Sequence, residues 1–183
     1  MPKNELIMLN NVRLSFPSLF QTEKFGGDDT GKFGCSLILD KNLHAKEIDG
    51  LTKKINAMIQ TELKVSSIPE NKRCLKDGDD SGRPEYAGSY VLRVTSKKRP
   101  TVVDKDKSPL VESDDRPYPG CYVNACVSLW VQNNSFGKRI NANVHGIQFA
   151  RDGEPFGESI DVADQFEVVE DVDGVAVPDT EEF

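Results

Sequence analysis

Apolar and polar residues alternate with a period of two in several parts of the chain, which is the pattern of half-buried strands. The alternation is clearest over residues 10–16 and returns at residues 33–39, 89–95 and 121–132. Glycine-rich or proline-rich stretches separate these runs, and Asn133 to Gly137 is typical of a hairpin turn before one more strand. We therefore predict five or six strands, with a bulge at Gly146 in the last one.

The first two runs also predict which side chains face the core. Val12, Leu14 and Phe16 fall on one face of the first strand, and Phe33 and Cys35 begin the corresponding face of the second. The prolines and glycines that follow each run indicate loops. The longest of these loops, residues 66–88, is polar, and loops of this length are often functional.

Residues 42–64 have the period of an amphipathic helix instead. Leu51, Ile55 and Ile59 share one face, and Asn42 is a suitable N-cap residue. One helix among strands, without an alternating strand-helix-strand rhythm, favours a mainly β fold. We predict an OB-fold-like barrel of five to six strands with one inserted helix, and a β-sandwich is the alternative that periodicity leaves open.

Charge is divided unequally along the chain. Residues 152–183 contain twelve acidic residues and no Lys or Arg, whereas residues 1–151 contain all 23 Lys and Arg residues against 18 Asp and Glu. We predict an OB-like binding domain over residues 1–168 and a flexible acidic tail over residues 169–183. A basic domain suits a polyanionic partner, and an acidic tail is typical of either an interaction element or a solubility element.

Several classes of protein are disfavoured by the sequence. No apolar run approaches the roughly 20 residues of a membrane-spanning helix, so we expect a cytoplasmic protein with no membrane partner. The four cysteines include no CxxC pair and stand far from both histidines, which argues against a structural zinc site. Phosphate-binding loops, the zinc-protease motif and the serine-nucleophile elbow are absent from the sequence. We expect a non-enzymatic protein that needs no metal or other cofactor.

Aromatic and basic residues are interleaved on the polar faces of the predicted strands and in the loops beside them. Aromatic rings stack on unpaired bases of any identity, while Lys and Arg contact the phosphates. This combination predicts a groove for single-stranded nucleic acid. The candidate DNA-binding residues are Arg13, Arg93, Lys97, Lys98, Arg99, Tyr122, Trp130, Lys138, Arg139 and Asn141.

Four strings, taken in order, resemble a known phage family. They are residues 12–20 (VRLSFPSLF), 98–100 (KRP), 119–125 (PGCYVNA) and 146–157 (GIQFARDGEPFG). The family, formerly a domain of unknown function, is understood as phage single-stranded DNA-binding proteins, and the resemblance covers residues 5 to about 168. It implies an OB-fold, DNA binding with little sequence preference, and a role in phage DNA replication or recombination. The expected location is then the cytoplasm of the infected bacterial host.

The C-terminal end resembles the acidic, aromatic-ended tails of other phage single-strand binders. The residues concerned are Asp179, Glu181, Glu182 and Phe183. The resemblance implies that this tail contacts replication or recombination proteins and competes with DNA for the groove. The sequence leaves open whether the protein is a monomer or a dimer, and whether duplex DNA also binds more weakly.

Two other functions fit parts of the sequence. The acidic tail could make the protein a nucleic-acid mimic that blocks a host factor. Alternatively, Asp77, Asp79 and Asp80 could hold a divalent ion in a small nuclease, although their spacing lacks the twelve-residue pattern of an EF-hand. A solvated loop is the simpler interpretation of these three carboxylates.

Overall fold

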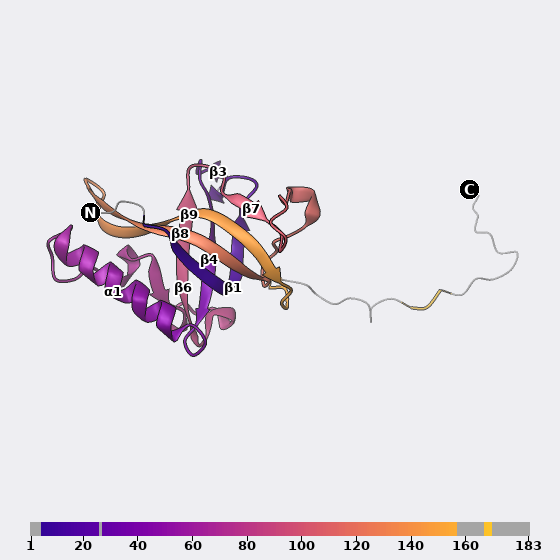
Figure 1. The fold of residues 1–183 in the computed structure, drawn as a ribbon, viewed down its shortest axis with the longest axis horizontal. Helices are drawn as coiled ribbons and strands as arrows, with labels where there is room; N and C mark the ends of the chain where they lie inside the picture. The colour runs from indigo at the N-terminus through magenta and orange to yellow at the C-terminus, as the bar shows by residue number, and fades with distance from the viewer. Residues whose placement is uncertain (1–4, 26, 157–166, 170–183) are drawn as a thin grey trace, which may run out of the picture.

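The computed structural model describes residues 5–25, 27–156 and 167–169 of the chain. Figure 1 shows strongly curved strands with one long helix beside them. The strands of the main sheet are β1 (Ile7–Ser18), β4 (Phe33–Asp40), β5 (Leu75–Asp77), β6 (Ser89–Ser96), β7 (Thr101–Val103), β8 (Tyr122–Asn134) and β9 (Gly137–Arg151). A separate hairpin consists of β2 (Lys24–Phe25) and β3 (Asp28–Asp29).

Five of these strands close into a barrel. The order in the sheet is β5-β6-β4-β1-β8-β9-β7, and β6 and β9 pair in addition, with Thr95 opposite Asn143. This last pairing joins the first and last strands of the series β6-β4-β1-β8-β9. These five strands therefore form a closed barrel. The structure therefore confirms the mainly β, OB-like barrel and not the sandwich alternative.

The hairpin of β8 and β9 is the longest element of the sheet, and it contains the predicted bulge. Cys126 pairs with Gly146, whereas the next residue, Val127, pairs with Val144, so His145 is the extra residue on β9. A bulge bends a strand and increases its twist, which the closure of a small barrel requires. The bulge expected at Gly146 is confirmed.

The core lies inside the barrel and under the helix. The inward residues Val12, Leu14, Cys35, Leu37 and Leu39 have no more than 1% of their surface exposed, as the alternation predicts. The second face of β4 is buried too, because Ser36 and Ile38 are less than 9% exposed. A strand that is buried on both faces occupies a central position in the fold.

Phe16 does not face the core, contrary to the sequence prediction. Its φ angle is +47°, the register of β1 against β4 shifts between Ser15 and Ser18, and the Phe16 side chain is 52% exposed. Ser15 pairs with Ser36 on the second face of β4, is buried there, and shares a 2.9 Å hydrogen bond with the hydroxyl of Tyr86. This register shift moves the side chains that follow it in β1 to the opposite face of the strand. A strict period of two does not anticipate such a change.

The predicted helix is present as α1 (Ala45–Thr61), and it buries Leu51, Ile55 and Ile59. Gly50 lies within it, so the whole first half is helical despite this glycine. Among the described residues, no helix is long and apolar enough to cross a membrane.

The helix begins later than predicted, and Asn42 does not cap it. His44 is the N-cap residue and makes no side-chain capping bond. Asp40 organises the turn before the helix instead, because its Oδ1 accepts hydrogen bonds from the backbone N–H groups of Asn42 (2.8 Å) and Leu43 (3.0 Å). These bonds commit residues 40–43 to a turn, and the helix starts only after it.

Short elements occupy the long loops that the sequence predicts. Residues 66–88 include β5 and the 3₁₀ turns Glu70–Lys72, Gly78–Asp80 and Pro84–Tyr86, and a fourth such turn is Glu112–Asp114. The predicted tail residues Asp179, Glu181, Glu182 and Phe183 lie outside the described residues, so the flexible tail stays a prediction. The same holds for the domain boundary at residue 168.

An ion cluster fixes the loop that follows β5. The Nζ of Lys41 lies 2.9 Å from an oxygen of Asp77 and 2.7 Å from an oxygen of Asp79. The hydrogen bond from Lys41, with further bonds from backbone N–H groups, lowers the pKa of both carboxyl groups below the ordinary value. A lowered carboxyl pKa stabilises the folded state at neutral pH, and this contribution disappears as the pH falls through the folded pKa values, below about pH 4.

We expect Lys41→Met to lower the free energy of unfolding at pH 7 by a modest amount, because all three side chains are partly exposed to water. The deficit relative to wild type should shrink below about pH 4, where Asp77 and Asp79 become protonated. Urea unfolding followed by circular dichroism from pH 7 to pH 2.5 measures this difference. Lys53→Met, which removes an exposed pair with Asp49, is the control and should have almost no effect. A Lys41→Met deficit that is constant with pH would contradict the assignment.

Candidate nucleic-acid interface

Two pockets meet on the surface of the barrel where β6 lies against the β8–β9 hairpin. Their volumes are about 600 Å³ and about 320 Å³. Lys32, Thr95 and Trp130 line both of them, so the two pockets are parts of one depression. We call this depression, defined by the residues that line either pocket, the groove.

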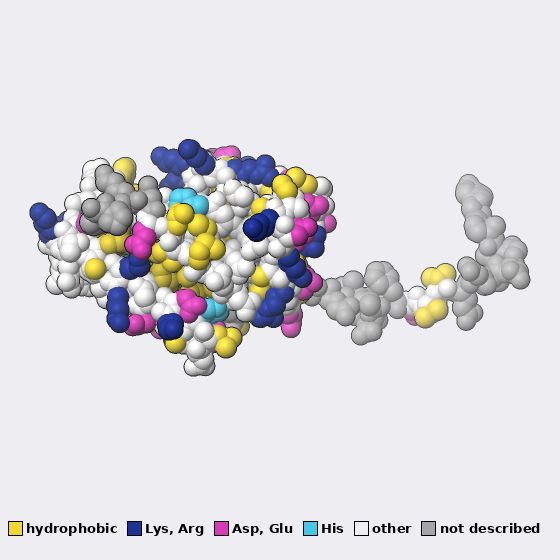
Figure 2. Space-filling view, in the orientation of Figure 1, with side chains coloured by type: hydrophobic (Ala, Val, Ile, Leu, Met, Phe, Trp, Pro, Cys, Tyr) yellow, Lys and Arg dark blue, Asp and Glu magenta, His cyan; other side chains and the backbone are white. Residues whose placement is uncertain are grey.

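Lysine and arginine side chains converge on the groove from distant parts of the chain. These residues are Lys32, Arg73, Lys76, Arg93, Lys97, Lys98, Arg99 and Arg139. Among the described residues that line the two pockets there is no Asp or Glu. Figure 2 shows Lys and Arg gathered along the edge of the molecule where β3 and β7 lie in Figure 1. The groove therefore has a positive potential that attracts polyanions.

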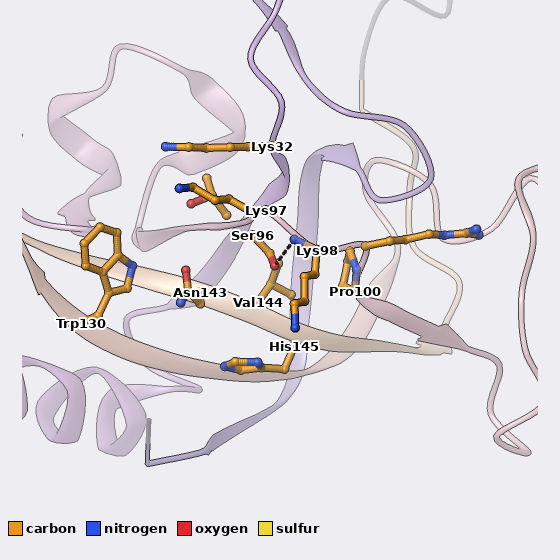
Figure 3. Close-up of a pocket in the computed structure, with 11 residues that line it drawn as sticks. Lys32, Ser96, Lys97, Lys98, Pro100, Trp130, Asn143, Val144 and His145 are labelled. Atoms are coloured by element: carbon orange, nitrogen blue, oxygen red, sulfur yellow. Dashed lines mark hydrogen bonds between the residues drawn. The ribbon is translucent and has the colours of Figure 1, made fainter. Parts of the chain in front are cut away.

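Trp130 lies at the junction of the two pockets, on the polar face of β8. Figure 3 shows Lys32 and Lys97 on the opposite side of the pocket from Trp130 and Asn143. The indole N–H of Trp130 is buried and has no hydrogen-bond partner among the described residues. A half-buried aromatic ring between cations is the arrangement that stacks on a base while its neighbours contact phosphates.

Hydrogen bonds hold several of the polar groove residues in place. Asn141 donates to Gln132 at 3.0 Å, and an Nη of Arg139 donates to the carbonyl of Asn71 at 3.3 Å. His145 Nε2 lies 2.8 Å from the hydroxyl of Ser128, which is fully buried. These bonds restrict the side chains before any ligand arrives, which lowers the entropy lost on binding.

Seven of the ten predicted DNA-binding residues come together in the groove, and their contact with DNA stays a prediction. Arg93, Lys97, Lys98, Arg99, Trp130, Arg139 and Asn141 were predicted and line the groove. The cations that sequence reasoning missed are Lys32, Arg73 and Lys76. They belong to the loops at residues 21–32 and 66–88, where no periodic pattern indicates the direction of a side chain. The exposed ring of Phe136, at the turn between β8 and β9, was also missed.

Arg13 and Tyr122 lie outside the two pockets. The Arg13 guanidinium is 4.1 Å from the ring centre of Phe156 and 5.6 Å from that of Tyr122, and Arg151 lies 3.8 Å from the same Tyr122 ring. Arg13 also donates to the carbonyl of Gly120 at 2.9 Å. The two residues belong to a separate cluster that holds the segment after β9 against the barrel, and their predicted contact with DNA stays a prediction.

Lys138 and Phe20 line neither pocket. The Nζ of Lys138 donates to the carbonyl of Leu63, after the helix, at 3.2 Å, and Lys138 lines neither pocket. Phe20 lies 5.3 Å from the guanidinium of Arg99, a groove residue. Lys138 therefore lies outside the two pockets, and its predicted contact with DNA stays a prediction.

Two of the three carboxylates of the alternative nuclease site, Asp77 and Asp79, are occupied by protein groups. Asp77 and Asp79 both bind Lys41, and Asp79 also accepts a hydrogen bond from the N–H of Gly88 at 2.8 Å. No group of three or more His, Cys, Asp or Glu side chains suited to a metal ion occurs within the described part of the chain. This loop therefore acts in the structure as an ion-paired turn.

A barrel of this topology with a basic, aromatic groove defines a class of proteins that bind single-stranded nucleic acid. A family model described as Enterobacter phage Enc34, ssDNA-binding protein, matches residues 5–176. The chain belongs to this family of phage single-stranded DNA-binding proteins, which confirms the resemblance seen in the sequence. Members of the family are binding proteins and not enzymes, so the expectation of a non-enzymatic chain is also confirmed.

Individual relatives agree with the family match. Protein p50 of Acyrthosiphon pisum secondary endosymbiont phage 1 is 36% identical over 159 residues, which cover 82% of this chain and 85% of that protein. The single-stranded DNA-binding protein of bacteriophage Enc34, solved in complex with single-stranded DNA, has 29% identity and a TM-score of 0.75, with 83% of this chain and 89% of the other covered.

A more distant structure shares the fold alone. The single-stranded DNA-binding protein of bacteriophage T7 has 13% identity and a TM-score of 0.57, and the match covers 93% of this chain and 99% of the other. At this level of identity the similarity supports the barrel topology and carries no argument about individual residues.

Proposed function

We propose that this chain binds single-stranded DNA in the groove, largely without regard to sequence, and without catalysing a reaction. The observation that carries the proposal is the convergence of eight Lys and Arg side chains around Trp130. The phosphates of a bound strand would lie against the cations, while a base stacks on the indole ring. Neither contact distinguishes one base from another. The complex of the Enc34 relative with single-stranded DNA supports the same class of ligand.

The arrangement favours single strands over duplex DNA for a geometric reason. Trp130 lines both pockets, and stacking on its ring requires a base that has left its own stack and its pairing partner. A duplex exposes phosphates but keeps its bases stacked, so it would use the cations alone. Duplex DNA is therefore the weaker ligand in this proposal.

Fluorescence anisotropy of a labelled oligo-dT, titrated with the protein at several salt concentrations, tests the proposal. We expect saturable binding whose affinity falls steeply as salt rises, because each phosphate contact releases counterions. A duplex of the same length should bind more weakly at every salt concentration. Binding that is absent at low salt, or that favours the duplex, would contradict the proposal.

We further propose that the protein acts in phage DNA replication or recombination, in the cytoplasm of the infected bacterial host. Both processes expose single strands, which re-pair or form hairpins unless they are coated. A binder with little sequence preference suits this task, since the exposed strand has no fixed sequence. Membership of a phage family supports the proposal.

The acidic segment supports a proposal about regulation by the tail, residues 169–183. Residues from Asp152 onward carry twelve acidic groups and no cation, while the groove is lined by cations. Being covalently attached, the tail is present near the groove at a high effective concentration, so its carboxylates would compete with phosphates. DNA binding would expel the tail, and Phe183 with its acidic neighbours would become available to replication or recombination proteins.

Deletion of residues 171–183 should tighten oligo-dT binding several-fold at low salt, because it removes the competing carboxylates. The gain should shrink as salt rises, since screening weakens the attraction between tail and groove. Phe183→Ala should reproduce part of the gain. Anisotropy titrations of the three proteins measure these effects, and equal affinities at low salt would leave the tail as a solubility element.

A further inference from the structure

Glu23, which lines neither pocket, forms an ion pair with Arg93, one of the cations of the groove. The carboxylate of Glu23 forms an ion pair with the guanidinium of Arg93, which lines the smaller pocket. The Glu23 side chain is only 19% exposed, and that of Arg93 is 38% exposed. Salt screens a pair that is partly removed from water less than it screens a pair on the open surface.

The position of Glu23 is fixed by the backbone of the arm that connects β1 to β4, residues 21–25 and 27–32. The N–H of Glu23 donates to the carbonyl of Lys32 at 2.7 Å, and its own carbonyl accepts from the N–H of Thr30 at 2.8 Å. Glu23 and Lys32 therefore lie side by side at the base of the arm. Lys32 lines both pockets, so the arm brings one cation and one anion to the groove.

The anion lies where the proposed function would place a phosphate. Arg93 belongs to β6, two residues before Thr95, which lines both pockets. A carboxylate and a phosphate both offer oxygens that accept charge-assisted hydrogen bonds from a guanidinium. One guanidinium cannot give its full set of hydrogen bonds to both groups, so a strand that uses Arg93 has to exchange with Glu23.

We propose that Glu23 sets the affinity of the groove by occupying Arg93 whenever no DNA is bound. This inference rests on the proposed binding of single-stranded DNA in the groove. In the free protein, Glu23 neutralises the charge of the partly buried Arg93. An incoming phosphate then displaces the Glu23 carboxylate from Arg93. The exchange replaces one anion by another at Arg93, so this contact adds little to the affinity and little to its salt dependence.

The Glu23→Gln variant tests the inference, since it removes the charge and keeps the shape of the side chain. Arg93 then becomes a free phosphate contact, and one such contact adds about 0.7 to the slope of log K against log salt for a single strand. We expect a slope that is steeper by about 0.7 and an affinity for oligo-dT that is about fivefold higher at 0.1 M salt. Thermal unfolding of both proteins verifies that the variant is folded.

Glu47→Gln is the matched control, because it changes the net charge equally on helix α1, away from the groove. It should leave both the affinity and the slope at the wild-type values. A gain as large in Glu47→Gln as in Glu23→Gln would mean a general charge effect and would overturn the role of Glu23. Unchanged or weaker binding by Glu23→Gln, while wild type binds oligo-dT, would overturn it too and leave the proposed function standing. Failure of the wild-type protein to bind oligo-dT would instead refute the proposed function.

Discussion

Replacing Lys97, Lys98 and Arg99 together by alanine is expected to weaken oligo-dT binding by about two orders of magnitude at 0.1 M salt. The three side chains line the larger pocket in consecutive positions after β6. Each phosphate contact contributes about 0.7 to the salt slope for a single strand, so three contacts contribute about 2, which is about a hundredfold at this salt concentration. Anisotropy titrations between 0.05 and 0.3 M salt measure both the affinity and the slope.

The chain offers a matched control with the same change of charge. Lys46, Lys53 and Lys54 belong to helix α1 and line neither pocket, so their joint replacement by alanine should leave the slope almost unchanged. If the two triple variants lost affinity equally, net charge and not the groove would determine binding. A slope unchanged in the first variant would show that the strand does not follow residues 97–99.

Trp130→Ala is expected to weaken oligo-dT binding by about 1 to 3 kcal/mol, or roughly fivefold to 150-fold, through the loss of one stacked base. The salt slope should stay close to that of wild type, because no cation is removed. Trp130→Phe keeps an aromatic face and should recover part of the affinity. Equilibrium titrations with oligo-dT measure the loss, and urea unfolding shows whether the variants remain folded.

Tyr122→Ala provides the comparison. The sequence predicts the same loss for Tyr122 as for Trp130, whereas the structure places Tyr122 against Arg13 and Arg151, outside both pockets. Binding in the groove therefore predicts a smaller loss for Tyr122→Ala. A large loss for Tyr122→Ala together with no loss for Trp130→Ala would move the stacking surface to the other end of β8.

Tyr122 and Trp130 show that a strand pattern predicts the face on which a side chain lies but not the surface of the barrel to which it belongs. Both residues have the same parity on β8, and alternation correctly assigns them to its polar side. Eight residues of strand are about 26 Å long, however, and the strand twists along that length. Two side chains on one nominal face can therefore belong to different surfaces of a small barrel.

The strands of the barrel were predictable because burial imposes a regular pattern on them. Val12, Leu14, Leu37 and Leu39 alternate with polar or second-face residues and are fully buried. Phe16 breaks the rule because its positive φ angle and the register shift turn it outward. Such a bulge leaves no periodic trace in a single sequence, since the alternation of apolar and polar residues continues unbroken from Val12 to Phe16.

The groove was predictable where it is built from strands and from the basic cluster, residues 97–99, that directly follows β6. Trp130, Arg139 and Asn141 come from the hairpin, and their side follows from the register of β8 and β9. Lys32 and Arg73 come from loops that approach the groove through contacts between residues far apart in sequence. The pairing of Glu23 with Arg93 joins positions 70 residues apart, and no local pattern records it.

The emission of Trp130 during titration with unlabelled oligo-dT tests binding in the groove most directly. Trp130 is the single tryptophan of the chain, so the signal has one source, at the junction of the two pockets. Binding in the groove predicts a saturable change in emission that follows the anisotropy of labelled oligo-dT and shifts to higher DNA concentration as salt rises. Oligo-dT that binds while the Trp130 emission stays constant would show that the strand lies elsewhere on the protein.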